Sequence, residues 1–550
     1  MSQATTLSEL GLLLDVLGRA VAARSKEKGF EAVQPEAFGL ARALAARAAA
    51  DALDAWARRH SEHERAIAAQ GVASAALEID RWAQSVPLAL GDHGLSTPSK
   101  TWIRDTLSGD VSGALGAAII ARESDPAGAL GLAEMPAMIR SEFARFADAE
   151  VAPRAEHIHR HDALIPEALL KSMGQLGVFG ISIPEEYGGN FVDHQTMIIA
   201  TEELSRGSLG AGGSVITRPE ICAKAILKGG TPEQRTYWLP RLASGKTLIS
   251  VAVTEPDAGS DVARVKLAAK KVDGGYVLNG EKTWCTFAGR ADVLCVLART
   301  GRIEDGHKGL TLFLVEKSRH TSEDVGESAA HAAAHLRPDQ RFDYVQPEFT
   351  LTSGGTHPGG RLDGTAIPTI GYRGMHSFSV SFEDVFVPDS HRIGDEGQGF
   401  YLQMAGFAGG RIQTAARAVG VMEAAFRAAL SYVRDRKVFG KPLADYPLTR
   451  IKLAEMAARI QASRQLAYAV GEKMDQGGGD MEASLVKLLS CKDAEWVTRE
   501  AMQLHGGMGY SEEYAVSRYY QDARVLSIFE GAEEVLALMV VARPYLAGLT

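Results

Sequence analysis

A single glutamate near the end of the chain has the surroundings of an acid–base catalyst. Glu530 lies in the segment 522–532 (DARVLSIFEGA), after Ile528 and Phe529 and before Gly531. An apolar, water-excluding environment raises the pKa of a carboxyl group, which suits it to remove a weakly acidic carbon-bound proton. Gly531 lacks a side chain and therefore lets backbone approach a ligand closely. These residues predict a general base at Glu530.

Two segments in the middle of the chain have the composition of a ligand-binding loop and strand. In 253–261 (VTEPDAGSD), Pro256 and Gly259 force turns at the end of a predicted strand. Turns at that place present N–H and hydroxyl groups to a ligand, although an ordinary polar loop is the alternative interpretation. The segment 284–286 (WCT) follows soon after. Taken alone, a Trp beside a Thr in a strand is most often a core residue.

Two further segments are rich in the residue types that bind phosphate. Arg436 opens 436–441 (RKVFGK), and 503–507 (QLHGG) carries paired glycines. The planar guanidinium of arginine suits phosphate, but a solvated basic helix end is the alternative. No GxGxxG motif follows a predicted strand, so a Rossmann domain is not supported.

Four regions with different residue patterns must position these segments. Residues 1–133 are rich in Ala, Leu, Arg and Glu and predict a helical bundle, followed by a second helical region at 134–247. Short β-branched and aromatic runs separated by Gly, Asn and Asp predict a small β domain at 248–394. Within it, 318–370 shows little periodicity and resembles an inserted surface excursion. Residues 395–550 are helical again.

Individual elements can be assigned within these regions. Strands are expected over 248–254, 293–298, 310–315 and 379–387, with a hairpin around 273–282. The longest expected helices are 37–56, 415–435 and 449–475, and glycines at 477–479 end the last of these.

The bulk composition excludes several classes of protein. A net charge of −9 argues against a nucleic-acid-binding surface. The four cysteines are scattered without a CxxC pair, which predicts a reducing, cytoplasmic compartment with neither structural disulfides nor a metal site. Asp15 interrupts the Leu-rich start of the chain, so a signal peptide is not expected. The longest apolar run, 536–542, is too short to span a bilayer.

The order and spacing of 253–261, 284–286 and 522–532 resemble the acyl-CoA dehydrogenase family of flavoproteins. The resemblance covers residues 134–550. It implies a mainly α, α+β fold with a helical domain, a small β-barrel-like domain and a C-terminal four-helix bundle, here with an extra N-terminal helical region. It also implies FAD as cofactor and α,β-dehydrogenation of an acyl-CoA thioester.

The resemblance assigns roles residue by residue. It makes Glu530 the catalytic base and places Ser260, Arg411 and Gly531 beside the substrate. The residues implied to hold FAD within one subunit are Val253, Thr254, Gly259, Ser260, Trp284 and Thr286. Those implied to reach the FAD of a neighbouring subunit are Arg436, Phe439, Gln503, Gly506 and Gly507.

Three positions bear on how closely the chain follows the family pattern. Cys285 stands where Ile or Val is usual, and Pro447 stands where the family has Gln. Some family members carry their base just before the matching arginine, but the residue there is Gly410, which has no carboxylate. Glu533 and Glu534 follow Glu530 closely, so a solvated acidic helix start is the alternative for all three.

The N-terminal region, the excursion and 371–377 (GYRGMHS) resemble a branch of the family that acts on a short branched or dicarboxylic acyl-CoA. A second carboxylate needs a cation or several donors. Arg218 is the nearest cation in the segment that matches the acyl end, although an arginine before a proline is more often on the surface. Arg373 and His376 are further candidates.

The resemblance also implies partners, and it leaves other functions open. Electron-transferring flavoprotein is the implied electron acceptor, and a homo-oligomer, a dimer or a dimer of dimers, is the implied assembly. An oxidase or monooxygenase on the same fold is one alternative, and a non-enzymatic binding protein is another. The retention of Glu530, Trp284 and Thr286 together argues against the latter.

Overall fold

Helices make up most of the chain, and its main β-sheet lies in one stretch. The computed structural model describes residues 2–86, 94–317, 341–351 and 353–549. The mainly α fold with a separate sheet matches the predicted fold class. The chain divides into a helical unit (Met1–Arg145, Asp193–Gly207 and Arg411–Thr550) and a sheet unit (Phe146–Val192 and Ser208–Gly410).

The helical unit consists of long helices that agree with the predicted ones. The N-terminal helices are α1 (Gln3–Lys28), α2 (Gln34–Ala57), α3 (Glu62–Ser85), α4 (Thr97–Thr106) and α5 (Gly109–Ala121). The middle ones are α6 (Glu134–Phe146) and α9 (His194–Gly207). The C-terminal ones are α13 (Gly399–Asp435, of which the part from Arg411 belongs here), α14 (Pro447–Asp475), α15 (Asp480–Leu504), α16 (Val516–Leu526), α17 (Glu533–Val535), the π-helix η11 (Leu536–Ala542) and α18 (Arg543–Gly548).

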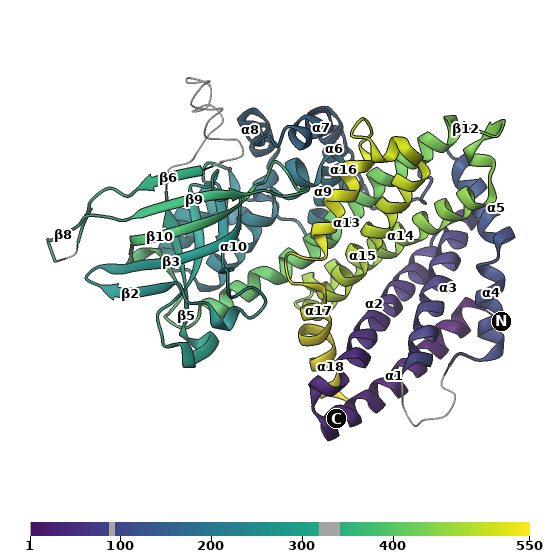
Figure 1. Ribbon diagram of the computed structural model, residues 1–550, viewed down its shortest axis with the longest axis horizontal. Coiled ribbons are helices and arrows are strands. Elements are labelled where there is room, and N and C mark those ends of the chain that lie inside the picture. Colours follow the sequence, from purple (N-terminus) through teal and green to yellow (C-terminus); the bar gives the residue numbers. More distant parts are fainter. Residues whose placement is uncertain (1, 87–93, 318–340, 352, 550) are drawn as a thin grey trace. The chain divides into compact units, whose positions relative to one another are not determined.

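The N-terminal region packs on the C-terminal helices of the same unit. Alanines along α2 leave little bulk between helices, and α2 contacts both α3 and α14 (Figure 1). The side-chain amide of Gln461 on α14 donates to the carbonyl of Ala127 at 2.8 Å. Gly116 on α5 lies so close to α14 that a Cβ there would be 2.0 Å from the carbonyl oxygen of Arg450. Sequence analysis predicted the helices but not where they pack.

The sheet has the strand order β11-β5-β4-β2-β3-β10-β9-β6, and β1 pairs with β4. Its strands are β1 (Ile249–Ala252), β2 (Ala268–Val272), β3 (Gly275–Thr286), β4 (Val293–Arg299), β5 (Leu310–Glu316), β6 (Arg341–Val345), β9 (Arg361–Ile367), β10 (Ser377–Pro388) and β11 (Arg392–Ile393). The four predicted strand runs correspond to β1, β4, β5 and β10, and the predicted hairpin is β2–β3.

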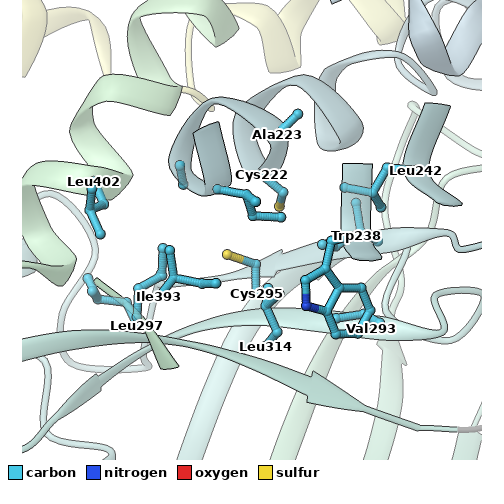
Figure 2. Packing of buried hydrophobic residues seen from close by; sticks show 14 of the residues in the cluster. Cys222, Ala223, Trp238, Leu242, Val293, Cys295, Leu297, Leu314, Ile393 and Leu402 are labelled. Carbon is cyan, nitrogen blue, oxygen red and sulfur yellow. The ribbon is translucent and has the colours of Figure 1, made fainter. Parts of the chain in front are cut away.

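Both faces of the sheet are covered near β4. Successive residues of β4 alternate between two apolar clusters, with Cys295 in one and Val296 in the other. Figure 2 shows the first cluster, in which Cys222 of α10 (Thr217–Gly229) and Trp238 of α11 (Pro232–Ala243) lie against Cys295. A strand buried on both faces has a continuous apolar sequence, as β4 does.

The predicted excursion contains regular structure in its second part. Its residues 318–340 lie outside the described part of the chain. From 341 onward, β6 pairs with β9 and β9 pairs with β10, so this stretch extends the main sheet (Figure 1). In the sequence, a small hairpin of β7 (Phe349–Thr350) and β8 (Thr356–His357) comes between β6 and β9. Sequence analysis assigned no strands here, because their residues lack a long apolar alternation.

The other α-helices among the described residues of the sheet unit are α7 (Ala152–Arg160), α8 (Glu167–Leu176) and the first part of α13, to Gly410. Among the described residues, no helix is both long and apolar enough to cross a membrane.

Candidate active site

A buried lysine holds the start of the loop after β1 through hydrogen bonds. Lys282 on β3 is fully buried, and its Nζ donates at 2.9 Å to the carbonyl of Val253 and at 2.9 Å to Oε1 of Glu255. The N–H of Thr283 donates to the carbonyl of Thr254 at 2.8 Å. Burial lowers the pKa of Lys282 to about 8, and the carboxylate of Glu255 opposes that change.

Glu255 completes this network while leaving the loop tip open. Its carboxylate accepts hydrogen bonds from the N–H groups of Lys266 and Leu267 at 2.7 and 2.8 Å. Gly259 and Ser260, further along the loop, are exposed. The base of the loop is therefore rigid, and its tip is accessible to a ligand.

Sequence analysis missed Lys282 and Glu255, although one signal for the lysine was present. Alternate residues of β3 face inward, and Tyr276 and Leu278 are both buried. Lys282 is separated from these residues by an even number of positions, so it lies on the same face of the strand. The period of two along β3 therefore predicts a buried lysine. Glu255 lies in a loop and offers no such pattern.

The aromatic ring of Trp284 is exposed at the end of β3. Its side chain is 54% exposed, and its backbone has a φ of +55°, in the left-handed region that non-glycine residues rarely adopt. The core interpretation of this Trp is therefore wrong. Cys285 packs as a small buried hydrophobe, as expected, and burial raises the pKa of its thiol to about 12. Thr286 is buried, and its hydroxyl shares a 3.0 Å hydrogen bond with that of Ser377.

The 371–377 loop is anchored to the last turn of α7 and to the residues just after it. Arg373 donates to the carbonyl of His159 at 2.7 Å, and Nε2 of His376 lies 3.1 Å from the carboxylate of Asp162. The N–H of Phe287 donates to the carbonyl of His376 at 2.8 Å. Arg373 and His376 thus contact the protein itself and fix the loop beside the end of β3.

Arg218 is a buried residue of α10. Only 6% of it is exposed, so its interpretation as a surface arginine is wrong. Glu220, two residues further on, is also buried, and its Oε1 lies 2.7 Å from Nζ of Lys224. This part of the sheet unit therefore buries two charged side chains close together in sequence.

Glu530 lies in a tight turn between α16 and α17 of the helical unit. Its φ is +55° and that of Gly531 is +99°, so two consecutive residues are left-handed. Nζ of Lys487, on α15, donates to the carbonyls of Phe529 and Gly531 at 2.8 and 2.5 Å. Ile528 is 55% exposed, because it lies in the turn after α16, and it does not provide the apolar surroundings that sequence analysis expected of it.

The neighbouring acidic residues have different positions from Glu530. Helix α17 begins at Glu533, whose carboxylate pairs with Lys492 at 3.1 Å, and Glu534 is exposed. Glu530 precedes this helix in a left-handed turn. It is therefore distinct from the acidic helix start.

Two arginines of α13 lie close to the Glu530 turn. Burial lowers the pKa of Arg411, and the carboxylates of Asp480 and Glu530 oppose that change. Nε of Arg411 is buried without a hydrogen-bond partner among the described residues. The guanidinium of Arg417 lies 4.7 Å from the ring centre of Phe529. Positively charged side chains thus lie close to the turn.

The segments expected to reach a neighbouring subunit lie on the surface of the helical unit. Phe439 is 99% exposed with a φ of +47°, in the hairpin of β12 (Lys437–Val438) and β13 (Lys441–Pro442). Arg436, Gln503, Gly506 and Gly507 are also exposed. Pro447 starts α14, where a missing N–H costs nothing.

The predicted site residues divide between the two units. The sheet unit carries Val253, Thr254, Gly259, Ser260, Trp284, Thr286 and Arg218. The helical unit carries Glu530, Gly531, Arg411, Arg436, Phe439, Gln503, Gly506 and Gly507.

Comparisons with known proteins identify the class of protein. The models of the acyl-CoA dehydrogenase N-terminal, middle and C-terminal domains match residues 134–246, 250–338 and 397–545. The chain belongs to the acyl-CoA dehydrogenase family and is an FAD-dependent oxidoreductase.

Individual relatives share much of the chain. It is 40% identical over 418 residues to (2S)-methylsuccinyl-CoA dehydrogenase of Cereibacter sphaeroides, covering 76% of this chain and 70% of that protein. Butyryl-CoA dehydrogenase from Megasphaera elsdenii has a TM-score of 0.64 at 30% identity, covering 74% of this chain and 97% of that one. A structure titled electron transferring flavoprotein of Acidaminococcus fermentans has a TM-score of 0.66 at 30% identity, covering 76% and 99%.

The residues of the sheet unit fit a flavin. An exposed indole beside a buried strand gives a planar ring an aromatic surface, and Trp284 provides it. The loop that carries Gly259 and Ser260 is fixed at its base and open at its tip. Backbone N–H and hydroxyl groups in such a loop suit the polar groups of a dinucleotide.

Proposed function

We propose that this chain converts (2S)-methylsuccinyl-CoA to mesaconyl-CoA, with Glu530 as the base that removes the α-proton. The observation that carries the mechanism is the left-handed turn at Glu530, which presents one carboxylate apart from the acidic start of α17. The 40% identity to a (2S)-methylsuccinyl-CoA dehydrogenase supports the choice of substrate. This activity would belong to the ethylmalonyl-CoA pathway.

The roles of the residues follow from the chemistry of a thioester. Its α-proton is weakly acidic, so a positioned base is needed, and Glu530 supplies it. When bound, FAD supplies the acceptor for the β-hydrogen as hydride. Ser260 lies beside the thioester, Arg411 contacts the CoA portion, and the bare backbone of Gly531 allows close approach.

The cofactor is held by two sets of residues in this proposal. Within one subunit they are Val253, Thr254, Gly259, Ser260, Trp284 and Thr286. The second set, Arg436, Phe439, Gln503, Gly506 and Gly507, reaches the FAD of a partner in a homo-oligomer. The nearly complete exposure of Phe439 is consistent with this, because it leaves the aromatic ring available to another subunit. Electron-transferring flavoprotein accepts the electrons. Four free, buried cysteines support a cytoplasmic location.

Arg218 is the proposed determinant of the dicarboxylic substrate. Its burial supports this role, because a buried guanidinium provides the charge-assisted hydrogen bonds that a second carboxylate needs. A second substrate carboxylate that is buried without a cation costs several kcal/mol, so the loss of Arg218 should weaken turnover of the dicarboxylic substrate strongly.

A substrate panel tests the proposal. The purified enzyme would be assayed with (2S)-methylsuccinyl-, glutaryl-, isovaleryl-, 2-methylbutyryl- and butyryl-CoA and an artificial electron acceptor. Arg218→Ala should reduce kcat/KM for methylsuccinyl-CoA by roughly 10² or more, while changing that for a neutral branched substrate little. Lys228→Ala removes an exposed cation from the same helix and should change neither.

Each outcome has a distinct meaning. Equal losses on dicarboxylic and neutral substrates would assign Arg218 a structural role. A wild-type preference for neutral acyl chains would overturn the methylsuccinyl assignment and leave acyl-CoA dehydrogenation standing. Rapid reoxidation of the reduced flavin in air would indicate an oxidase. A flavin that no acyl-CoA reduces would refute the dehydrogenase function.

A further inference from the structure

The backbone on both sides of Glu530 is bonded to one buried ammonium group. Lys487 lies in the middle of α15 and is only 1% exposed. Its Nζ donates to the carbonyl of Phe529 at 2.8 Å and to that of Gly531 at 2.5 Å. These two carbonyls belong to the residues immediately before and after Glu530.

The two hydrogen bonds hold a backbone conformation that is costly by itself. Glu530 has a φ of +55°, a conformation that is unfavourable for a residue other than glycine. Both carbonyls point toward the same nitrogen, which fixes the peptide group before Glu530 and the one after Gly531 and so restrains the turn between them. The direction of the Cα–Cβ bond of Glu530 is restrained with the turn. Gly531 packs against Leu536, whose Cδ2 would lie 2.8 Å from a Cβ at that position.

A buried lysine usually pairs with a carboxylate, as Lys282 does with Glu255. The hydrogen bonds of Lys487 go instead to main-chain oxygens. The ionisable groups that act on it are the thiol of Cys491, one turn along α15, and the side chains of Glu530, Arg417 and Arg411. Burial lowers the pKa of Lys487, and Cys491 and Glu530 oppose that change.

We propose that Lys487 is a positioning residue for catalysis: it fixes the direction of the Glu530 side chain through the two flanking carbonyls. The proposal rests on the proposed role of Glu530 as the base. Lys487 need not touch the substrate in this role. Lys487 interacts electrostatically with Glu530, and removing a cation disfavours a nearby carboxylate, so Lys487→Met should raise the pH at which flavin reduction becomes active.

The test compares Lys487→Met and Lys487→Arg with a matched control. Lys492→Met removes a lysine of the same helix that contacts Glu533, in the segment just after the turn, from a half-exposed position. Flavin reduction by acyl-CoA would be followed by stopped flow across pH, with FAD content and thermal midpoint measured for each protein. Misplacing a catalytic group by about 1 Å can cost on the order of 10²-fold in rate.

We expect Lys487→Met to reduce the limiting rate of flavin reduction by that factor, with KM changed less than threefold. The midpoint of its pH profile should move upward. Lys487→Arg, which keeps charge and donors, should recover part of the rate, and Lys492→Met should match the wild type. In a Glu530→Gln background, Lys487→Met should cause no further loss, because it acts through Glu530.

The failures of the two proposals differ. If acyl-CoA does not reduce the wild-type flavin, the dehydrogenase function fails, and the role of Lys487 fails with it. If the wild type is active and Lys487→Met retains its rate and pH midpoint, only the positioning role is wrong. A lower thermal midpoint and FAD content with an unshifted pH profile would show that Lys487 is structural. Should Lys487→Met not fold, Lys487→Gln decides, because it keeps a donor but loses the charge: a rate and pH midpoint equal to wild type at lowered stability would overturn the proposal, and a rate loss at normal FAD content would support it.

Discussion

Nζ of Lys282 lies 2.9 Å from Oε1 of Glu255, and both side chains are buried beneath the loop that carries Gly259 and Ser260. The same Nζ donates to the carbonyl of Val253. This ion pair connects β3 to the start of the loop. The conformation of the loop therefore depends on the buried positive charge of Lys282.

The first prediction concerns the pH dependence of stability at Lys282. Its pKa is about 8 in the folded chain, against an ordinary value of 10.5. Between these values the unfolded chain binds a proton that the folded chain has lost, so the free energy of unfolding rises with pH. Relative to Lys282→Met, the wild type should gain about 3 kcal/mol from pH 8 to pH 10.5.

Urea unfolding of both proteins at a series of pH values measures this difference. Lys271→Met, which removes an exposed lysine of the neighbouring strand β2, is the control and should follow the wild type. A constant difference between wild type and Lys282→Met across the range would show that Lys282 titrates near its ordinary value.

The second prediction concerns the base. Glu530→Gln is nearly isosteric, so the fold and the bound FAD should be retained. Flavin reduction by substrate and exchange of the α-proton with deuterated solvent should fall by about 10² or more, because a positioned base is lost. Glu534→Gln changes an exposed glutamate four residues further on and should leave both rates unchanged. Substantial activity in Glu530→Gln would reject the assignment.

The third prediction concerns cofactor retention. Arg436→Ala should weaken FAD binding by about 10- to 100-fold, because a charge-assisted hydrogen bond contributes about 1.5–3 kcal/mol. The ratio of FAD to protein after extensive dialysis, measured together with the molar mass in solution, checks this. Arg499→Ala, an exposed arginine of the same unit, should retain the cofactor. Monomeric wild-type protein with full FAD occupancy would contradict the cross-subunit role.

The fourth prediction concerns the packing of the N-terminal region on α14. A Cβ on Gly116 would lie 2.0 Å from the carbonyl oxygen of Arg450, so Gly116→Ala should destabilise the protein by about 1–3 kcal/mol. Gly113, on the same helix, has open space at its Cβ position. Gly113→Ala should therefore stabilise by about 0.5–1 kcal/mol, since alanine favours helix over glycine. Equal effects of the two changes on urea unfolding would show that α5 does not pack as described.

The sequence by itself determined the elements whose signals are local. The apolar run 293–298 predicts β4 because a strand buried on both faces needs apolar residues throughout. The helix at 449–475 follows from periodicity, and the glycines after it end it. The order of the motifs around Trp284 and Glu530 was sufficient to identify the family, which the domain matches confirm.

The tertiary structure alone decided how those residues are held. Lys487 binds the carbonyls on both sides of Glu530, and every residue carries a carbonyl, so the sequence offers no sign of this contact. The close approach of Gly116 to Arg450 joins segments more than three hundred residues apart, whose pairing no local pattern encodes. The exposed, left-handed Trp284 ends a strand whose alternation predicts an inward-facing side chain. Local residue preferences therefore set the elements and the motifs, whereas long-range backbone contacts set the geometry of the candidate site.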